Sequence, residues 1–372
     1  MSIPRISLPR DTAALLEPLA ERARAEGLAL YAVGGCVRDW ILGRKDVYDL
    51  DLVAEGDPSE VAALCGRMLG AKAEAFGEFG TLRVKSRRLR VDFAAARQEE
   101  YPEPACLPKV KPASLERDLL RRDFTINAMA VRLEPQGVGA LVDPYGGLRD
   151  LKAGILRVLH PASFRDDPTR VFRAARFACR FQFRLAPGFL TMTRESLYGC
   201  IAGRLSRHRI AAELMRILGE SDPACPLRRL RTWGYLDLVH IAAPARAEGE
   251  TAEERLGSMA LAMGEKGKEL LASLPVERGL ARRISLALEL AQDRAAPRAA
   301  LPPETRRMLI LAFPHLPESA LQPCFLGGDD LSRAGLKPGP QFRAILDDAA
   351  RAQWAGRIRD RGQAQDWLRR RI

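Results

Sequence analysis

The chain is poor in features that mark membrane, secreted or zinc-ribbon proteins. No stretch of its 372 residues approaches the ~18 consecutive apolar residues of a membrane helix. Its start, Met1 to Arg5, lacks the apolar core of a signal peptide. Its seven cysteines form no C-x-x-C pair, which argues against a zinc ribbon or a disulfide framework and predicts buried free thiols. We therefore expect a soluble cytoplasmic protein.

Positive charge is what the chain has in excess. Its formal net charge is +12, and its apolar share of 47% is ample for packed cores. Such a charge favours a polyanionic partner, although excess charge also serves solubility alone. The length is sufficient for two or more small domains.

A Gly-Gly turn followed by two aspartates is the most informative local pattern. Gly34 and Gly35 open a short helix, where backbone N–H groups can bind phosphate. Asp49 and Asp51 lie two apart in a strand-like run, so their side chains share one face. Two carboxylates beside a phosphate-binding turn describe a Mg²⁺-nucleotide site. The alternative is that both aspartates are turn or cap residues.

A third carboxylate, Asp92, lies in a later strand candidate at 89–93. If this strand neighbours Asp49 and Asp51, the three acids form a site for two Mg²⁺ ions. One ion would lower the pKa of an attacking hydroxyl and the other would hold a triphosphate. The alternative is a surface carboxylate on an edge strand.

The remaining patterns predict an α+β protein. Alternating and helical periodicities are followed after Asp150 by almost continuous helix signals, so a mixed-sheet head of about 150 residues precedes an all-helical body. Four prolines between Gln98 and Pro112 indicate a mobile loop. The head elements that we expect are a helix at 11–26 with Asp11 as N-cap, strands at 28–33, 49–54, 82–85 and 89–93, and helices at 36–42 and 58–69.

Basic and polar residues around these elements could bind a nucleotide. Arg38 could clamp a phosphate bidentately, or simply pair with Asp39 or Asp46. Further along, arginines followed by an aspartate and an asparagine can hold phosphate and ribose hydroxyls together; as a bare pattern this is a solvated helix end. The residues concerned are Arg121, Arg122, Asp123 and Asn127.

Asp167 and Arg170 begin a helix and are three residues apart, so they share a face. A carboxylate accepts from an exocyclic amino group, and a guanidinium donates to a ring nitrogen or carbonyl. Cytosine and adenine both offer an amino donor beside a ring-nitrogen acceptor, whereas uracil and guanine present a ring N–H there. This pair could therefore select CTP and ATP, with Arg173 and Arg176 on the basic side facing triphosphate or RNA. The alternative is a capping acid and a surface ion pair.

The motifs resemble those of bacterial class II tRNA nucleotidyltransferases, a family that also contains bacterial poly(A) polymerases. One departure is Asp166, which stands where the family has Glu in its Glu-Asp-x-x-Arg motif and shortens a supporting carboxylate. The match covers roughly residues 28–220 and comprises, in order, Gly34-Gly35-x-Val-Arg-Asp, Asp49-x-Asp51, Arg121-Arg122-Asp-Phe-Thr-Ile-Asn-Ala, Asp-Pro-Tyr-Gly-Gly and Asp167-Pro-Thr-Arg170-x-x-Arg173.

The resemblance implies a polymerase-β-like head followed by a helical neck, body and tail, which we place at 1–150, 151–222, 223–300 and 301–372. It implies that Asp49 and Asp51 bind Mg²⁺, with Asp92 as the third carboxylate. The expected contacts with the triphosphate and the nucleotide come from Gly34, Gly35, Arg38, Arg122 and Asp123.

The expected activity is template-independent addition of CMP and AMP, from CTP and ATP, to the 3′ end of tRNA, with release of pyrophosphate. Alternatives are an enzyme that adds only CC or only A, a poly(A) polymerase, and a non-catalytic RNA-binding module. Intact metal ligands argue against the last. In the tail, seven arginines from Arg351 onward, with Trp354 and Trp367, suit contacts with tRNA, although such tryptophans are also common in cores.

Overall fold

The computed structural model describes residues 6, 8–44, 48–239 and 247–372. The chain divides into two compact units, Met1–Arg204 and Leu205–Ile372, which are described separately below. Two expectations fall outside the described residues: the one about Met1 to Arg5 and the pairing of Arg38 with Asp46.

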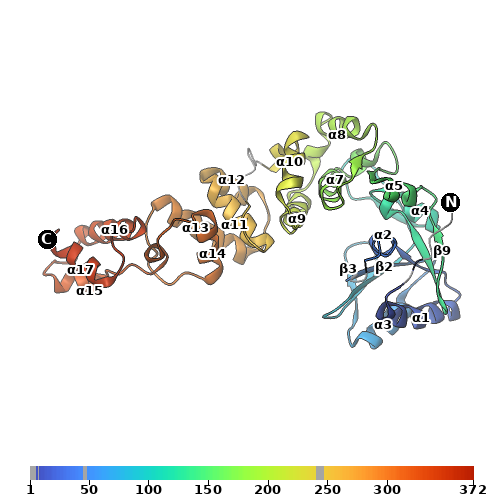
Figure 1. The fold of residues 1–372 in the computed structure, drawn as a ribbon, viewed down its shortest axis with the longest axis horizontal. Helices are drawn as coiled ribbons and strands as arrows, with labels where there is room; N and C mark the ends of the chain where they lie inside the picture. Colours follow the sequence, from blue (N-terminus) through green and yellow to red (C-terminus); the bar gives the residue numbers. More distant parts are fainter. Residues whose placement is uncertain (1–5, 7, 45–47, 240–246) are drawn as a thin grey trace. The chain divides into compact units, whose positions relative to one another are not determined.

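A seven-stranded mixed sheet forms the centre of the first unit, in the order β3-β4-β5-β2-β1-β8-β9 (Figure 1). β2 and β5 run parallel, and the other neighbours run antiparallel. The strands expected at four places are confirmed as β1, β2, β4 and β5, whereas the other three were not predicted. The strands are β1 (Leu30–Val33), β2 (Asp49–Ala54), β3 (Ala73–Phe76), β4 (Thr81–Lys85), β5 (Arg90–Ala95), β8 (Ala130–Glu134) and β9 (Gly137–Val142).

Helices cover both faces of this sheet. Figure 1 shows α1 (Arg10–Ala25) and α3 (Ser59–Leu69) on one face and α2 (Gly35–Ile41) on the other. Side chains along β2 alternate between the two faces of the sheet. Leu50 and Leu52 are buried on one face, and Asp49 and Asp51 lie on the other. The three helices confirm the expected positions.

Two local expectations were wrong. The N-cap of α1 is Pro9 rather than Asp11, because the helix begins earlier than the apolar pattern indicated. The segment Gln98 to Pro112 is not a simple loop, because β6 (Arg97–Glu100) and β7 (Lys109–Pro112) pair antiparallel as a hairpin. Prolines are tolerated there because the connection and an edge strand need no amide donor.

Short helices complete the first unit. Gly147, at the start of α5, lies against the chain after Arg122: a Cβ there would come within 2.2 Å of the Thr125 carbonyl oxygen. Phe124 and Phe177 meet edge to face at 5.8 Å between ring centroids and join this segment to α7. The elements are α4 (Leu115–Leu120), η1 (Thr125–Asn127), α5 (Gly147–Ala153), β10 (Ile155–Leu156), α6 (Ser163–Asp166), α7 (Thr169–Arg180), β11 (Arg184–Leu185), α8 (Phe189–Tyr198) and η2 (Ala202–Arg204).

The second unit contains helices but no strand among its described residues, as expected. The expectation of a helical neck at 151–222 was wrong in one detail, because β10 and β11 pair there as a small parallel sheet. Trp354 is buried, which supports the core alternative for this residue, and the partly buried Trp367 packs on the cluster around Leu331. The elements are α9 (Arg207–Leu218), α10 (Ala224–Thr232), η3 (Tyr235–Val239), α11 (Ala252–Met263), α12 (Glu265–Ser273), α13 (Arg278–Asp293), α14 (Pro303–Ala312), η4 (Glu318–Leu321), α15 (Gly328–Arg333), α16 (Pro340–Trp354) and α17 (Arg361–Arg369).

The cysteines follow the expectation of buried free thiols only in part. Cys36 and Cys65 are free and buried, and burial raises the pKa of both thiols to about 12. The expectation of burial was wrong for Cys106 and Cys200, which are free but exposed. In the part of the chain that the structure describes, no helix has the length and apolar character to cross a bilayer.

Candidate active site

The carboxylates predicted to act together come from adjacent strands. β2 and β5 are parallel neighbours, and Asp51 lies in register with Asp92. Asp49, two residues before Asp51, shares its face. Burial raises the pKa of the Asp51 carboxyl, the charges of Asp92 and Asp49 raise it further, and Arg122 and Arg90 oppose them. The condition set for Asp92, that its strand lies beside that of Asp49 and Asp51, is therefore met.

Arginines already neutralise two of these carboxylates. Arg83 of β4 forms a bidentate pair with Asp92, with both N···O distances at 2.7 Å. Arg90 reaches Asp49 at 2.8 Å. Arg83 was not predicted as a site residue, although it lies directly across from Asp92 in the antiparallel pair of β4 and β5. Since β5 is an inner strand, the edge-strand alternative for Asp92 was wrong.

Asp49 and Asp51 carry the carboxylate oxygens that Mg²⁺ prefers, so the donor chemistry of this pair fits the ion. Burial, together with repulsion from Asp92 and Asp49, raises the pKa of Asp51, and a bound cation relieves such repulsion. Within the described residues, no group of three or more His, Cys, Asp or Glu side chains is arranged to hold a metal. The fit thus rests on the pair, while Asp92 is engaged by Arg83.

The glycine turn makes room for an arginine. Gly34 has φ +75°, and a Cβ at this position would lie 2.7 Å from Nη1 of Arg122. Its N–H donates to the Met129 carbonyl at 3.0 Å. This amide is therefore engaged within the protein, and Gly34 contributes close approach of the Arg122 guanidinium to the turn. Gly35 begins α2 beside it.

A chain of hydrogen bonds joins α2 to α7 through η1. The buried Arg38 donates from Nη1 to Asn127 Oδ1 at 2.5 Å, and Asn127 Nδ2 donates to Asp123 Oδ1 at 3.0 Å. Arg173 then donates from Nε to Asp123 Oδ2 at 2.8 Å. Arg38 also pairs with Asp39 at 3.0 Å, as its alternative interpretation proposed. The structure thus brings together four of the predicted nucleotide-binding residues.

Aromatic rings lie against Arg38 of this hydrogen-bonded chain and against a second arginine, Arg176. The guanidinium carbon of Arg38 lies 4.7 Å from the centroid of the Phe181 ring, and that of the buried Arg176 lies 5.6 Å from the Phe177 ring. Although burial raises the pKa of Asp123, Arg173 and the Asn127 amide hold it below its usual value. Asp123 therefore stays ionised among these arginines.

The start of α7 holds the pair predicted to select the base. Asp167 Oδ1 accepts from the Thr169 N–H at 2.9 Å, but the N-cap of α7 is Pro168, so Asp167 lies one residue before the cap position that the alternative interpretation gave it. Arg170 is buried and donates from Nη1 to Ser163 Oγ at 2.8 Å and from Nη2 to the Arg121 carbonyl at 2.7 Å. A cavity of about 350 Å³ lies beside Arg170, and its lining includes Tyr101 and Asp166 but not Asp167.

Comparisons with known proteins agree with this geometry. Residues 30–157 match the family described as the poly A polymerase head domain. The chain is 33% identical to the CC-adding tRNA nucleotidyltransferase of Deinococcus radiodurans over 366 residues, which cover 97% of this chain and 94% of that protein. It is 46% identical to the A-adding tRNA nucleotidyltransferase of Aquifex aeolicus over 193 residues, 52% of this chain but only 23% of that protein.

A second A-adding relative, from Geobacter sulfurreducens, is 39% identical over 63% of this chain. The chain spans about a quarter of the length of these two A-adding relatives. Among solved structures, an apo form of a CCA-adding enzyme has a TM-score of 0.73 at 27% identity. The Thermotoga maritima CCA-adding enzyme complexed with tRNA has a TM-score of 0.67 at 26% identity. Both matches cover all of each chain.

Proposed function

The chain belongs to the tRNA nucleotidyltransferase family, and from this premise we propose that it adds CMP, AMP or both to the 3′ end of tRNA without a template. The observation that carries the proposal is the similarity along 97% of the chain to a CC-adding enzyme, together with Asp49 and Asp51 on one face of β2. The 3′-hydroxyl would attack the α-phosphate of CTP or ATP and release pyrophosphate.

For the chemistry, we propose that Asp49 and Asp51 hold two Mg²⁺ ions, with Asp92 as a third carboxylate. Nucleotidyltransferases generally use divalent metal ions. Bound Mg²⁺ would lower the pKa of the attacking hydroxyl and neutralise the triphosphate. Arg83 donates one hydrogen bond to each oxygen of Asp92, so a metal ion at this third carboxylate would share the group with Arg83.

For the nucleotide, we propose contacts on the side of the sheet that carries α2. Gly34 supports the proposal by admitting Arg122 next to the glycine turn. Hydrogen bonds through Asn127 and Asp123 fix the guanidinium groups of Arg38 and Arg173 in place before a nucleotide binds. Such preorganised donors bind phosphate and ribose without reorganisation during the reaction. The residues proposed for nucleotide contact are Gly34, Gly35, Arg38, Arg122, Asp123, Asn127, Arg173 and Arg176.

For the choice of base, we propose Asp167 and Arg170. Arg170 is fixed by two acceptors, Ser163 and the Arg121 carbonyl, so the direction of its guanidinium is defined. A fixed guanidinium rejects uracil and guanine because their ring N–H would oppose its own donors. Asp167 accepts from the Thr169 N–H at the start of α7, and its proposed role is to accept from the exocyclic amino group of the base.

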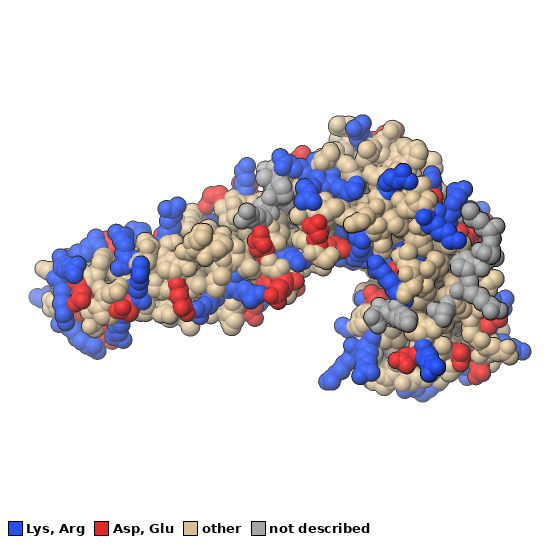
Figure 2. All heavy atoms as spheres, viewed as in Figure 1, with Lys and Arg blue, Asp and Glu red and all other residues tan. Residues whose placement is uncertain are grey.

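We further propose a head at 1–150, a base-selecting neck at 151–222, a body at 223–300 and a tRNA-contacting tail at 301–372, in a cytoplasmic protein. Support for the tail comes from its surface charge. Figure 2 shows Lys and Arg side chains gathered over the C-terminal end of the second unit, where α16 and α17 lie. The exposed arginines here include Arg357, Arg359, Arg369 and Arg370. Phosphate contacts by such residues require no sequence readout.

One assay tests the activity and its range. The purified protein is incubated with tRNAs that end at the discriminator base, at C or at CC, with CTP or ATP supplied singly, and the products are sequenced. Products ending in CCA, CC or A identify full or partial tRNA nucleotidyltransferases. Long adenosine tails would identify a poly(A) polymerase instead. RNA binding without incorporation would overturn the proposed enzyme in favour of a binding module.

A further inference from the structure

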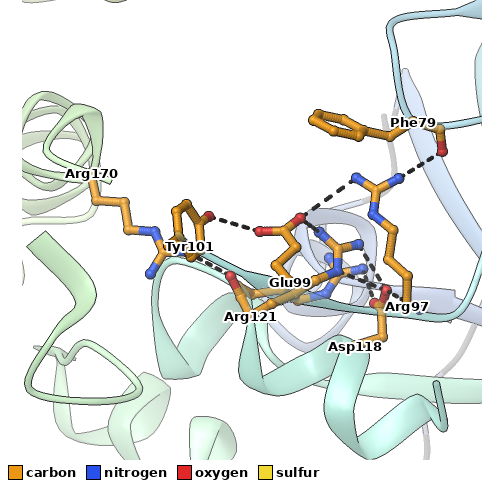
Figure 3. Close-up of polar contacts among 8 residues, drawn as sticks. Phe79, Arg97, Glu99, Tyr101, Asp118, Arg121 and Arg170 are labelled. Atoms are coloured by element: carbon orange, nitrogen blue, oxygen red, sulfur yellow. Dashed lines mark hydrogen bonds and ion pairs between the residues drawn. The ribbon is translucent and has the colours of Figure 1, made fainter. Parts of the chain in front are cut away.

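A buried network of arginines and acids connects the β6–β7 hairpin to α4 and α7 (Figure 3). At its centre, Asp118 is completely buried and accepts from Arg121 Nη2 at 2.7 Å and from Arg122 Nη2 at 3.0 Å. Although burial raises the pKa of Asp118, these two arginines hold it below its usual value. Such a buried ionic cluster is stable only while its partners stay in place.

Glu99 closes the other side of Arg121. Arg121 Nη1 donates to Glu99 Oε1 at 2.9 Å, and the Tyr101 hydroxyl donates to Glu99 Oε2 at 2.8 Å. Arg97, on the same face of β6, donates to the Phe79 carbonyl at 3.0 Å. The Arg121 side chain is thus fixed between two carboxylates, one from α4 and one from the hairpin.

The fixed residue presents its own backbone to the base-selecting arginine. Arg170 Nη2 donates to the Arg121 carbonyl oxygen at 2.7 Å (Figure 3). Clamping of the Arg121 side chain restricts the position of this carbonyl, and the carbonyl is one of two acceptors that orient Arg170. The path from Glu99 to Arg170 is therefore continuous: carboxylate, guanidinium, backbone carbonyl, guanidinium.

We propose that Glu99 and Tyr101 are positioning residues for base selection, acting through Arg121 on Arg170. This inference rests on the proposed function. Loss of the Glu99 charge leaves Arg121 held on one side only, and the Arg170 guanidinium then gains freedom to turn. Since selection depends on the direction of its donors, discrimination between bases falls, while the metal-binding aspartates are untouched.

The test compares Glu99→Gln and Tyr101→Phe with Glu100→Gln. Glu100 follows Glu99 on the other face of β6, where it pairs with Lys111 on the surface, and is therefore a matched control. Steady-state kcat and KM are measured for CTP and UTP on a tRNA ending at the discriminator base or at C. We expect the ratio of kcat/KM for CTP to that for UTP to fall about five- to tenfold in Glu99→Gln, less in Tyr101→Phe, and not in Glu100→Gln.

A merely structural role predicts a different pattern. Equal losses of kcat/KM for both nucleotides, with an unchanged ratio, would overturn the positioning role. In an Arg170→Ala background, Glu99→Gln should change the ratio no further, and an additional change would contradict the path through Arg170. Thermal unfolding monitors folding, and Tyr101→Phe, which removes one hydroxyl, carries the test if Glu99→Gln fails to fold. Absence of incorporation of both CTP and ATP by the unmodified chain, on tRNAs ending at the discriminator base, at C or at CC, would instead overturn the proposed function.

Discussion

Asp51 of β2 lies in register beside Asp92 of β5, across a parallel pair of strands. This relationship brings together two acids from separate parts of the chain and places them on the face that carries α2. It also explains the raised pKa of Asp51, to which burial contributes most and Asp92 adds. Arg83 forms a bidentate pair with Asp92 and so places a positive charge beside the two acids.

Removal of the first carboxylate should abolish nucleotide incorporation. Asp49→Ala is expected to reduce incorporation at least about a hundredfold, because the proposed metal site loses a ligand, while tRNA binding stays nearly intact. Product formation and tRNA binding are measured on the same preparation. Asp57→Asn, at an exposed aspartate that accepts from Ser59 beyond the end of β2, is the control and should retain activity. Undiminished turnover by Asp49→Ala would refute the metal site.

Arg170→Ala should weaken the preference for CTP and ATP over UTP. We expect the ratio of kcat/KM values to fall at least about tenfold, since a guanidinium that discriminates by its donors is gone. Single-nucleotide incorporation with CTP, ATP and UTP measures the ratios. Arg165→Ala, at the exposed arginine of α6, provides the control. Unchanged rejection of UTP would exclude Arg170 as the selecting residue.

Gly147→Ala should destabilise the first unit by about 1–3 kcal/mol, because overpacking forces backbone shifts. The added Cβ would lie 2.2 Å from the Thr125 carbonyl oxygen and 2.8 Å from Met129 Cγ. The measurement is the free energy of unfolding from urea titration. Gly203→Ala, where a Cβ meets nothing within 4 Å, should change this free energy little. A Gly147→Ala protein as stable as the wild type would show that the chain here can move aside.

The ion pair of Arg173 with Asp123 should make the free energy of unfolding depend on pH in the acidic range. Because Arg173 and Asn127 hold the pKa of Asp123 below its ordinary 3.8, the unfolded chain binds this proton at higher pH than the folded chain does. The stabilisation is complete above the unfolded pKa and is lost as the pH falls through the folded pKa. We expect the free energy of unfolding to fall below about pH 4, and to fall less steeply in Arg173→Gln.

Urea unfolding between pH 3 and 7 measures the slope of the free energy of unfolding against pH. Arg184→Gln, at an exposed arginine of β11, is the matched control and should retain the slope of the unmodified chain. An identical slope in Arg173→Gln would mean that Arg173 does not hold the pKa of Asp123 down.

The sequence was sufficient for features that depend on local geometry. The alternation of a strand places Asp49 and Asp51 on one face whatever the surrounding fold. A glycine pair between a strand and a helix predicts a turn, and Gly34 does adopt a positive φ there. The motifs around these residues also identified the family, which the comparison along nearly the whole chain confirms.

The tertiary structure alone decided which partners these residues have. Arg83 lies on Asp92, the Gly34 amide is bonded to Met129, and Glu99 clamps Arg121, although none of these pairs is adjacent in the sequence. The alternation of Arg97, Glu99 and Tyr101 could have indicated a strand with these three side chains on one face, but the prolines that follow favoured a loop. Periodicity fixes the side of an element on which a residue lies. Only the packing of distant segments decides what lies on that side with it, because those contacts depend on strand order and helix placement rather than on local backbone preference.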